Sequence, residues 1–573
     1  MKYIDYLKKL AEYFPYDQKV ETTVKELASL LNCSDRYVKT IVNYLNAAGV
    51  IKWETFRGRG KKPRITLCVN DREVLLELAK QNVKNGAYEK AFSQVQLVDE
   101  PWKSQFFEWF QNEVGIKQEM EDEIVDVLRY PFYETDLVLD PIHSISRHDA
   151  HMVQQIFDRL VEYDENDGIL IPQIAYAWES EDGKKWTFYL RKNVYFHHGR
   201  QLTSKDVVHT VNRLNFDSID NIVAPNKYVV IFQLKEVNYL FPRFLSSYKL
   251  SIVPIEVIEQ NADKFKKYPV GSGPFRLVKH NEEVIQLEYF EQYYKERPWL
   301  DRIEIIKAQS LFPEDKWYSF LLHPVNPDWR KVSKLEEGAS FITFNLRKGS
   351  PLANQKLRKM IYQSISKDAF RHNSSHYAVA HSFLSKRTKQ IEKNMKNVQK
   401  VEGGLADSLH LKIAAQQIRE GVNHEREANI LQEQLLKLGV IATVDVLDLQ
   451  QLTSEKSLQT YDLFVGGIAL GADALVSVYH ALQTSTVPIY PCLNTEMKKV
   501  VDHILTEIER CENEEIQWDL YFQIENFLQE EAILLFLNHR THTVYEPMNS
   551  VYQNIELNSN GRIDYRKVWK KWR

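Results

Sequence analysis

The sequence predicts a multidomain protein in which a small α+β unit at the amino end precedes a much larger α/β part. The chain has 573 residues, and domains of ~100–200 residues imply three or four folding units. Within residues 23–67, two helical apolar repeats precede two strand-like runs around a basic tip. Beyond residue 128, short β-rich runs alternate with amphipathic helices, which is the pattern of α/β lobes.

The amino-terminal helices are predicted from apolar spacing and capping signals. An apolar stripe over 4–14 favours a first helix beneath the next two. Thr23 with Glu26 has the spacing of a capping box, in which each residue satisfies an N–H of the first helical turn. Ser34 can cap a following helix that Gly49 ends.

The helix after Ser34 has a buried side and a free side. Apolar residues recur on one face, at Val38, Ile41, Val42, Leu45 and Ala48. The polar candidates for phosphate and base contacts in a major groove are Arg36, Tyr37, Lys39, Thr40 and Asn43.

The run VIKWETF, RGRGKKPR, ITLCV predicts two strands around a glycine-rich basic tip. The cations at or beside this tip are Arg57, Arg59, Lys61, Lys62 and Arg64. The alternative is an ordinary surface loop with solvated charges. Because the tip follows a helix-turn-helix pattern, residues 1–70 are predicted to form a winged helix-turn-helix that binds double-stranded DNA.

Net charge supports this placement of the DNA-binding surface. Residues 1–70 hold 13 Lys and Arg against 7 Asp and Glu, a net of +6, whereas the whole chain carries −4. The remaining 503 residues therefore carry −10. Only the amino end should attract DNA.

Residues 71–127 are predicted to be a helical connector that ends in an acidic linker near 117–127, and this linker is expected to run into a strand. Aromatic residues are dense in one helix of this connector, at Trp102, Phe106, Phe107, Trp109 and Phe110. They are interpreted as a core between helices, and the alternative is a dimer face.

No signal peptide or membrane span is expected. Charges interrupt the apolar stripe at the amino terminus, and no apolar run reaches membrane-spanning length. The four cysteines are scattered without a CxxC pair, which favours a reducing compartment. A cytoplasmic protein is the expectation.

The later part of the chain contains short motifs in a familiar order. LDP (139–141), IFDRL (156–160), PQIAYAWE (172–179), WTFYLR, FHHG, LTSKDV and PVGSGPF (269–275) follow one another, and ITFNLRKGSPLANQKLRKMIYQSISKD spans 342–368. In this order and spacing the chain resembles the family 5 extracytoplasmic solute-binding proteins, the oligopeptide, dipeptide and nickel receptors of ABC importers. The resemblance covers roughly 128–573 and implies a two-lobed α/β fold of the periplasmic-binding-protein type II class.

A narrower resemblance rests on GVIKW (49–53), the GRG of the wing (58–60) and VLRYPFY (127–133). With these motifs, a family 5 domain fused to an amino-terminal winged helix resembles the SgrR family of cytoplasmic transcriptional regulators. The resemblance implies a one-component sensor that binds DNA and a small solute. The alternative is a cytoplasmic solute-binding protein whose winged helix mediates protein contacts.

The receptor resemblance implies two lobes in 128–573 that close over a ligand by a hinge, with lobe crossings near 341–346 and 536–540. The candidate ligand-binding residues are Arg147, His148, Asn345, Arg347 and Asp473. Asp473 is the nearest match to the aspartate that pairs with a peptide amine in related receptors, although the Trp and Asp-Pro of that motif are missing. The others suit an anion such as the sugar phosphate that the SgrR resemblance suggests. A peptide-like solute is the alternative ligand.

Catalytic and metal sites are not expected. The chain contains no GxxxxGK[ST], GxSxG, HExxH or strand-linked GxGxxG motif. His143, His148 and His151 lie near one another, but no acid or cysteine has a standard ligand spacing beside them. The enzymatic rival is a winged helix fused to an aminotransferase-like domain, yet the receptor-like motifs occupy that region. No cofactor is expected, and oligomeric state stays open, since many winged helices form homodimers.

Overall fold

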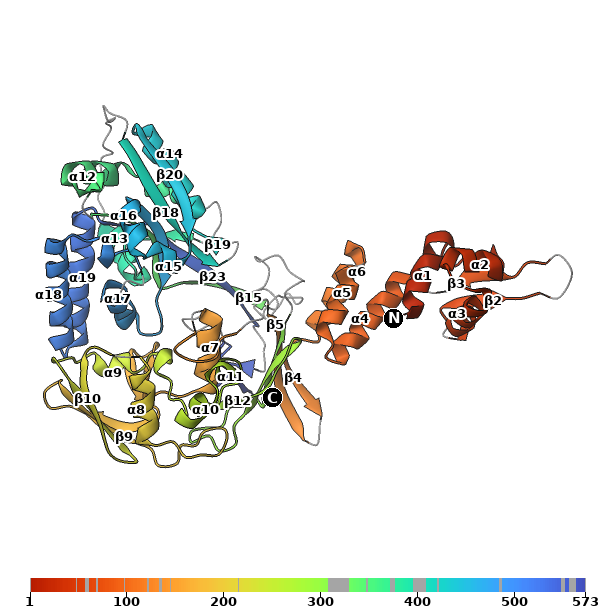
Figure 1. Cartoon of the computed structure of the whole chain (residues 1–573), viewed down its shortest axis with the longest axis horizontal. Helices are drawn as coiled ribbons and strands as arrows, with labels where there is room; N and C mark the ends of the chain where they lie inside the picture. The colour runs from red at the N-terminus through yellow and green to blue at the C-terminus, as the bar shows by residue number, and fades with distance from the viewer. Residues whose placement is uncertain are drawn as a thin grey trace. The chain divides into compact units, whose positions relative to one another are not determined.

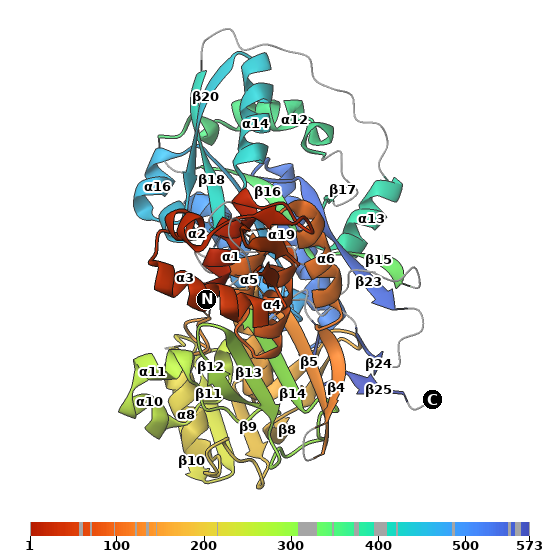
Figure 2. The same cartoon turned by 90° about the vertical axis from the view of Figure 1, so that its right-hand side faces the viewer.

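The structure is a computed structural model in which the chain forms two compact units. It describes residues 2–571 except 48, 57–60, 69–70, 97, 121–122, 133–136, 145, 215, 308–328, 347–348, 372–376, 395–408, 420–421, 484–486, 548–551 and 556–562. Unit 1 takes in residues 1–136, 278–288 and 300–327, and unit 2 takes in 137–277, 289–299 and 328–573. Figure 1 shows the elements of both units, and Figure 2 shows them after a quarter turn.

Unit 1 begins with helix, strand, two helices and two strands, the order expected for a winged helix. These elements are α1 (Lys2–Tyr13), β1 (Val20–Glu21), α2 (Val24–Leu31), α3 (Asp35–Ala47), β2 (Ile51–Glu54) and β3 (Arg64–Leu67). The strands form an antiparallel sheet in the order β1-β3-β2. The capping box of Thr23 and Glu26 is present, with Glu26 N donating to Thr23 Oγ1 at 3.2 Å. Val38, Ile41, Val42 and Leu45 of α3 are buried against α1, α2 and the sheet, as predicted, and Ala48 lies outside the described residues.

Three further helices follow, α4 (Asp71–Lys84), α5 (Tyr88–Gln96) and α6 (Glu100–Gln111). Phe106 and Phe110 of α6 are fully buried, and Trp102, Phe107 and Trp109 are partly buried against the same cluster. The prediction of an aromatic core between helices is therefore confirmed.

The segment expected as an acidic linker forms a hairpin instead. Strands β4 (Gly115–Met120) and β5 (Ile124–Phe132) pair antiparallel, and β5 pairs parallel with β14 (Arg302–Lys307). The sheet order is β12-β13-β14-β5-β4, with β12 at Phe275–His280 and β13 at Val284–Tyr289. The acidic run misled the prediction because one of its residues, Glu119 of β4, is paired within the sheet: Arg129 Nη2 of β5 donates to Glu119 at 2.9 Å, and Arg129 Nε donates to Glu304 of β14 at 2.6 Å. Because β13 and β14 pair into this sheet, the two compact units do not divide at 127/128, and the domain boundaries stay predictions.

Lobe I of unit 2, defined as residues 137–277, 289–299 and 552–571, contains an antiparallel sheet in the order β10-β11-β9-β8. Its strands are β6 (Val161–Asp164), β7 (Ile169–Pro172), β8 (Ala175–Glu179), β9 (Lys185–Leu190), β10 (Ile219–Asn226), β11 (Val229–Leu234), β24 (Tyr552–Gln553) and β25 (Trp569–Lys570). Its helices are α7 (Arg147–Ile156), α8 (Ser204–Asn212), α9 (Phe241–Phe244), α10 (Ile255–Gln260) and α11 (Ala262–Lys267). Alternate residues of β9 and β11 are buried, which is the period of strands with one covered face.

Lobe II, defined as residues 338–547, contains a mixed sheet in the order β19-β18-β21-β16-β22, with β20 paired to β18. Its strands are β16 (Gly338–Phe344), β17 (Tyr377–Val379), β18 (Leu409–Arg419), β19 (Val422–Asn423), β20 (Val440–Leu447), β21 (Leu463–Ala469), β22 (Leu534–Phe536) and β23 (Asn538–Pro547), and β23 also pairs with β15 (Trp329–Leu335). Its helices are α12 (Gln355–Ser364), α13 (Ser385–Asn394), α14 (Glu425–Lys437), α15 (Leu449–Leu452), α16 (Glu455–Thr460), α17 (Ala474–Gln483), α18 (Thr495–Arg510) and α19 (Glu514–Glu530).

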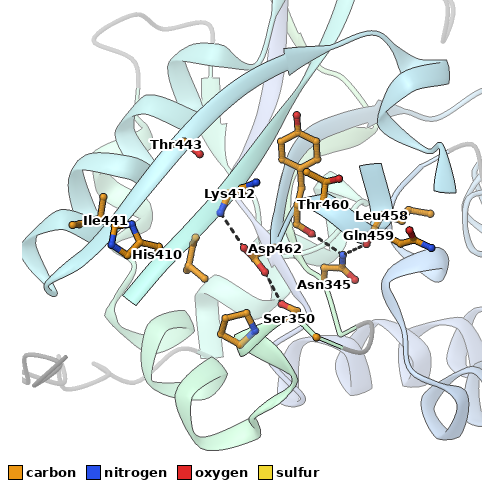
Figure 3. Close-up of a pocket in the computed structure, with 14 residues that line it drawn as sticks. Asn345, Ser350, His410, Lys412, Ile441, Thr443, Leu458, Gln459, Thr460 and Asp462 are labelled. Atoms are coloured by element: carbon orange, nitrogen blue, oxygen red, sulfur yellow. Dashed lines mark hydrogen bonds between the residues drawn. The ribbon is translucent and has the colours of Figure 1, made fainter. Parts of the chain in front are cut away.

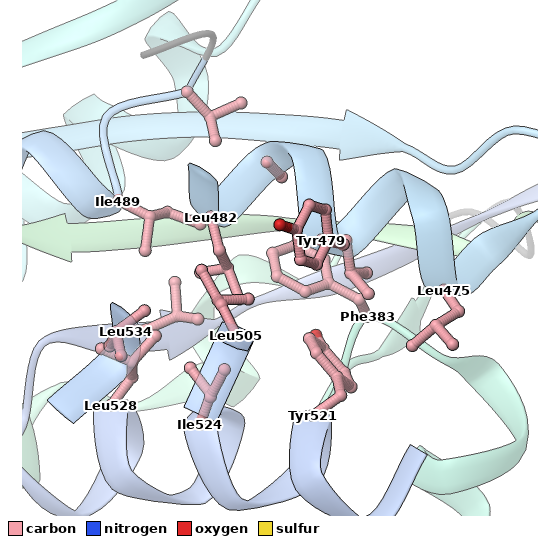
Figure 4. Close-up of a cluster of buried hydrophobic side chains, with 14 of the residues drawn as sticks. Phe383, Leu475, Tyr479, Leu482, Ile489, Leu505, Tyr521, Ile524, Leu528 and Leu534 are labelled. Atoms are coloured by element: carbon pink, nitrogen blue, oxygen red, sulfur yellow. The ribbon is translucent and has the colours of Figure 1, made fainter. Parts of the chain in front are cut away.

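Helices cover both faces of the lobe II sheet. Ile342 and Phe344 of β16 pack with α12 and α14, whereas Phe341 packs with α17, α18 and α19. This split follows from the alternation of side chains along a strand. Figure 4 shows the second cluster, in which Tyr479, Leu505 and Ile524 come from three different helices.

The segments predicted as lobe crossings lie side by side. Phe341 of β16 pairs with Phe536 of β22, and the Nδ1 atom of His539 is 2.6 Å from the Gly338 carbonyl oxygen. Gly338 has a φ of +112°, and a Cβ there would lie 2.1 Å from the Ile468 carbonyl oxygen. Only glycine fits this position, at the start of the strand. Among the described residues, no helix combines the length and the apolar character needed to cross a membrane.

Candidate nucleic-acid interface and solute-binding lobes

The free face of α3 presents the predicted base-contacting residues to solvent. Arg36, Lys39, Thr40 and Asn43 are exposed, because the other face of the helix packs in the core. The Thr40 hydroxyl donates to the Arg36 carbonyl oxygen at 3.3 Å. This face offers two cations and an amide, which are groups that read phosphates and base edges.

Tyr37 differs from its neighbours on α3. It is half-buried, and its ring meets Tyr6 of α1 edge-on with 6.0 Å between centroids. Tyr37 therefore joins the core cluster of the winged helix while one edge stays accessible.

The wing cations that the structure describes are Lys61, Lys62 and Arg64. Lys61 and Lys62 are exposed, and Lys62 Nζ lies 3.6 Å from Glu26. Arg64 pairs with Glu21 at 2.9 Å. Both ion pairs are exposed, so they are weak and a phosphate can replace the carboxylate. Arg57 and Arg59 lie outside the described residues.

Sequence reasoning missed two exposed aromatic residues beside this candidate surface. Tyr44 is 53% exposed beside Asn43 on α3. Phe56 is 41% exposed, and the Arg64 guanidinium lies over its ring at 5.3 Å from the centroid. A signal for Tyr44 existed in the sequence, since it falls outside the apolar repeat of the helix.

Asp473, the candidate nearest to a ligand-amine carboxylate, is buried and bound to an arginine of the other lobe. Arg243 of α9 donates from Nε to one Asp473 oxygen at 2.6 Å and from Nη2 to the other at 2.7 Å. Burial lowers the pKa of Arg243, but its bonds to Asp473 outweigh this and raise it above the ordinary value. Sequence reasoning missed Arg243, because nothing near it in the chain indicates a partner 230 residues away.

The remaining ligand candidates are dispersed. His148 is buried in α7 of lobe I, and Arg147 begins that helix. Asn345 follows β16, at the end of the lobe II sheet opposite Asp473, because β16 and β21 are antiparallel seven-residue strands. That places the two residues about 20 Å apart along the sheet. Arg347 lies outside the described residues.

Asn345 lines a cavity of about 320 Å³ at the amino ends of β18, β20 and β21 (Figure 3). Its side-chain amide donates to the carbonyl oxygens of Leu458 and Tyr461, both at 2.7 Å. Asp462 is held beside it by Ser350 Oγ at 2.9 Å and by the Lys412 N–H at 3.0 Å. These contacts fix the polar wall of the cavity, whose size is at the lower end of small-molecule sites.

The three histidines considered for a metal have different surroundings. His143 is half-exposed, and its Nδ1 lies 3.0 Å from Asp140. His148 and His151 are buried, and His151 meets the Tyr565 ring edge-on at 4.7 Å. Within the part of the chain that the structure describes, no three His, Cys, Asp or Glu side chains form a group suited to a metal ion.

Two family models match the chain. Residues 170–487 match the model of the bacterial extracellular solute-binding proteins, family 5, and residues 2–119 match the amino-terminal model of the sugar transport-related sRNA regulator. Neither description names an enzymatic activity.

Curated relatives fall into two groups. The Bacillus subtilis (strain 168) protein YhjP is 27% identical over 97% of this chain and 96% of its own length. The HTH-type transcriptional regulators SgrR of Yersinia enterocolitica and Escherichia coli K12 are 29% and 28% identical. Those two alignments cover 60% of this chain and 62% of each regulator.

Solved structures are similar in fold. A dipeptide-binding protein from Pseudoalteromonas sp. SM9913 in complex with Met-Leu has a TM-score of 0.61 at 17% identity, covering 78% of this chain and all of that chain. The substrate-binding protein CtaP from Listeria monocytogenes has a TM-score of 0.59 at 19% identity, with the same coverage. At such identities the likeness shows the fold alone, and it confirms the predicted two-lobed α/β architecture.

Proposed function

The chain belongs to the bacterial extracellular solute-binding proteins of family 5, and from that premise we propose that it is a transcriptional regulator that binds DNA and senses a solute. The observation that carries the proposal is the exposed cationic face of α3, together with the exposed Lys61 and Lys62 before β3, on a unit that matches a regulator's amino-terminal model. The same chain continues into a two-lobed binding fold. This combination supports a one-component sensor that acts in the cytoplasm, where the DNA is.

The DNA-binding step follows from the surface of unit 1. Helix α3 enters the major groove, where Arg36, Lys39 and Asn43 contact phosphates and base edges. Lys61 and Lys62 contact the phosphate backbone beside the groove. A homodimer would place two such helices about 34–36 Å apart on two half-sites.

The sensing step follows from the two lobes of unit 2. A solute that binds the closed form more tightly shifts the population toward it, and a coupling of about 1–3 kcal/mol is ordinary for such sensors. A sugar phosphate is the preferred ligand class, because the similar regulators carry a sugar-transport description. A peptide-like solute is the other class, since a solved neighbour holds a dipeptide.

The proposal is tested by selecting genomic fragments with the purified full chain, with and without a panel of sugar phosphates, peptides and metal salts. Enrichment of a few sites, altered by one ligand class, is the expected result and names the ligand chemistry. A folded protein that enriches no fragment under any condition would favour a solute-binding protein whose winged helix contacts other proteins.

A further inference from the structure

One arginine joins the two lobes through a buried, bidentate ion pair. Arg243 lies on α9 of lobe I, and Asp473 lies just before α17 of lobe II. Their side chains are 9% and 6% exposed, and two short hydrogen bonds connect them. A guanidinium and a carboxylate matched in this way form one of the stronger and more directional polar contacts in proteins.

The remaining surface of the Arg243 guanidinium is also occupied. Its Nη1 lies 3.3 Å from Glu514 at the start of α19, and its plane lies over the Tyr163 ring at 4.8 Å from the centroid. The Tyr163 hydroxyl in turn donates to Glu514 at 3.4 Å. Two carboxylates of lobe II therefore enclose one cation of lobe I.

A further hydrogen bond, to the backbone of α17, fixes the orientation of the Asp473 side chain. Its Oδ1 accepts a hydrogen bond from the Val476 N–H at 3.1 Å, so it also caps α17. Both carboxylate oxygens thus have partners within the chain.

Neighbouring contacts extend the junction between the lobes. Asn238 donates to the Glu509 carboxylate at 2.9 Å, and the Tyr239 N–H donates to the Glu509 carbonyl oxygen at 2.7 Å. Phe244 of α9 inserts into the lobe II core, 5.3 Å from the Tyr479 ring (Figure 4 shows Tyr479 in that core). The ion pair therefore lies beside an apolar contact that excludes water, where a charge-assisted bond is strengthened.

We propose that Arg243 and Asp473 form an internal latch that holds the two lobes together without a solute. Moving the lobes apart breaks both hydrogen bonds of the ion pair together, because Arg243 and Asp473 belong to different lobes. A solute acts by competing with the latch or by adding to it. The inference rests on the proposed sensing role of the lobes but not on DNA binding.

The test measures amide hydrogen exchange of the full chain, resolved to single residues, without DNA or solute. The reporter is the Tyr239 N–H, which bonds across the lobes. In Arg243→Gln and in Asp473→Asn we expect this amide to exchange at least about tenfold faster, since each change leaves the other charge without its partner. Asn at 473 keeps a capping acceptor for α17, so the change removes the charge and one of the two hydrogen bonds from Arg243 but not the cap.

Two further variants separate a latch from general support of the fold. Arg243→Lys keeps the positive charge but loses the paired donors that bind both carboxylate oxygens. The Tyr239 N–H should therefore exchange at a rate between those of the parent and of Arg243→Gln. Arg213 Nη2 lies 2.6 Å from Asp140 in a comparably buried ion pair inside lobe I. Arg213→Gln breaks this pair and should leave the exchange rate of the Tyr239 N–H unchanged.

Either of two results would overturn the latch. The first is an unchanged Tyr239 rate in both Arg243→Gln and Asp473→Asn. The second is a uniform rise of exchange throughout both lobes, which would give the pair a structural role only. Because no DNA is present, a failure here is distinct from a failure of fragment selection.

Discussion

The winged helix and the two-lobed unit contain ion pairs that differ in how far they are buried. In the winged helix, Lys62 and Glu26 pair at 3.6 Å with both side chains 54% exposed. In the two-lobed unit, Arg566 donates to Glu162 at 2.8 Å with the side chains 16% and 15% exposed. An exposed pair is screened and exchanges partners readily, whereas a buried pair fixes geometry and is costly to break singly.

This difference separates two ways of using charge. The amino-terminal cations are held loosely, so a phosphate backbone can take over from the carboxylates. In the lobes, burial acts to raise the pKa of Glu162, but the Arg566 and Arg159 guanidinium groups outweigh burial and hold that pKa well below its usual range. The buried ion pairs of lobe I therefore fix local geometry, whereas the exposed cations of the winged helix can exchange partners.

The largest effect should come from removing the loosely held cations. Alanine at Arg36, Lys39, Lys61 and Lys62 together should weaken DNA binding by about a thousandfold or more at low salt, because each cation neutralises a phosphate. The slope of log K against log salt should become shallower by about 0.9 for each phosphate that is no longer neutralised. Fluorescence anisotropy on a selected fragment at several salt concentrations measures both.

The matched control removes exposed lysines from the two-lobed unit. Its four changes, all to alanine, are at Lys205, Lys227, Lys437 and Lys456. This variant should bind DNA as the parent does. Equal losses in the two variants would show that net charge alone, rather than the winged-helix surface, attracts DNA.

The second effect contrasts the two cores. Leu27 in the winged helix and Leu431 in lobe II are both fully buried, so either change to alanine should cost about 2–5 kcal/mol. A small domain has little stability in reserve, so Leu27→Ala should unfold the winged helix and abolish DNA binding at 37 °C. Leu431→Ala should lower the melting temperature of the lobes and leave DNA binding intact. Calorimetry with a DNA-binding assay checks both, and loss of DNA binding in Leu431→Ala would contradict the independence of the two cores.

The winged helix was predictable because its signals are local. The Thr23 capping box, the apolar period of α3 and the basic tip each lie within a few residues of sequence. The β4–β5 hairpin was missed because its acidic residues suggested a linker, and only strand pairing with β14 reveals their partners. Local chemistry therefore predicted helices and caps well, and it could not predict pairing between distant strands.

A third effect is a pH dependence of stability to which His197 of lobe I contributes. Burial lowers the pKa of His197 to about 4, and Gly271 N–H donates to its Nδ1 at 3.3 Å, which suits the neutral ring. In the unfolded chain the ordinary value is about 6.5. Between these values the unfolded state binds the extra proton, so stability is full above about pH 6.5 and falls as the pH drops toward 4. The loss approaches about 3 kcal/mol at most.

Chemical denaturation at several pH values, with His197→Gln and His198→Gln compared, measures this dependence. His198 is exposed and pairs with Glu256, so its removal should leave the His197 contribution in place. His197→Gln should make the decline between pH 6.5 and 4 shallower, and the remaining decline comes from other buried histidines such as His381, whose pKa burial also lowers to about 4. An equally steep decline in that variant would assign it to other groups.

The surroundings of the candidate solute-binding residues were harder to predict than those of the candidate DNA-binding residues. Asp473 was identified from a motif, but its partner Arg243 is remote in sequence, and no periodicity links the two. Asn345 was expected in the cleft, and the antiparallel pairing of β16 with β21 places it at the far end of the sheet. Residue type indicated what these side chains can bind, and only the topology shows which of them meet.

The smallest effect compares two capping boxes, one in each region. Thr23 Oγ1 accepts from the Glu26 N–H at 3.2 Å in the winged helix, and Ser146 Oγ accepts from the Asp149 N–H at 3.0 Å in lobe I. Either change to alanine should cost about 1 kcal/mol. In the small winged helix this loss raises the unfolded fraction, so Thr23→Ala should weaken DNA binding a few-fold near 37 °C and hardly at 15 °C. Ser146→Ala should leave DNA binding unchanged at both temperatures, since lobe I has a larger core. A temperature-independent loss in Thr23→Ala would instead place the capping box, with Lys62 beside Glu26, in direct contact with the DNA.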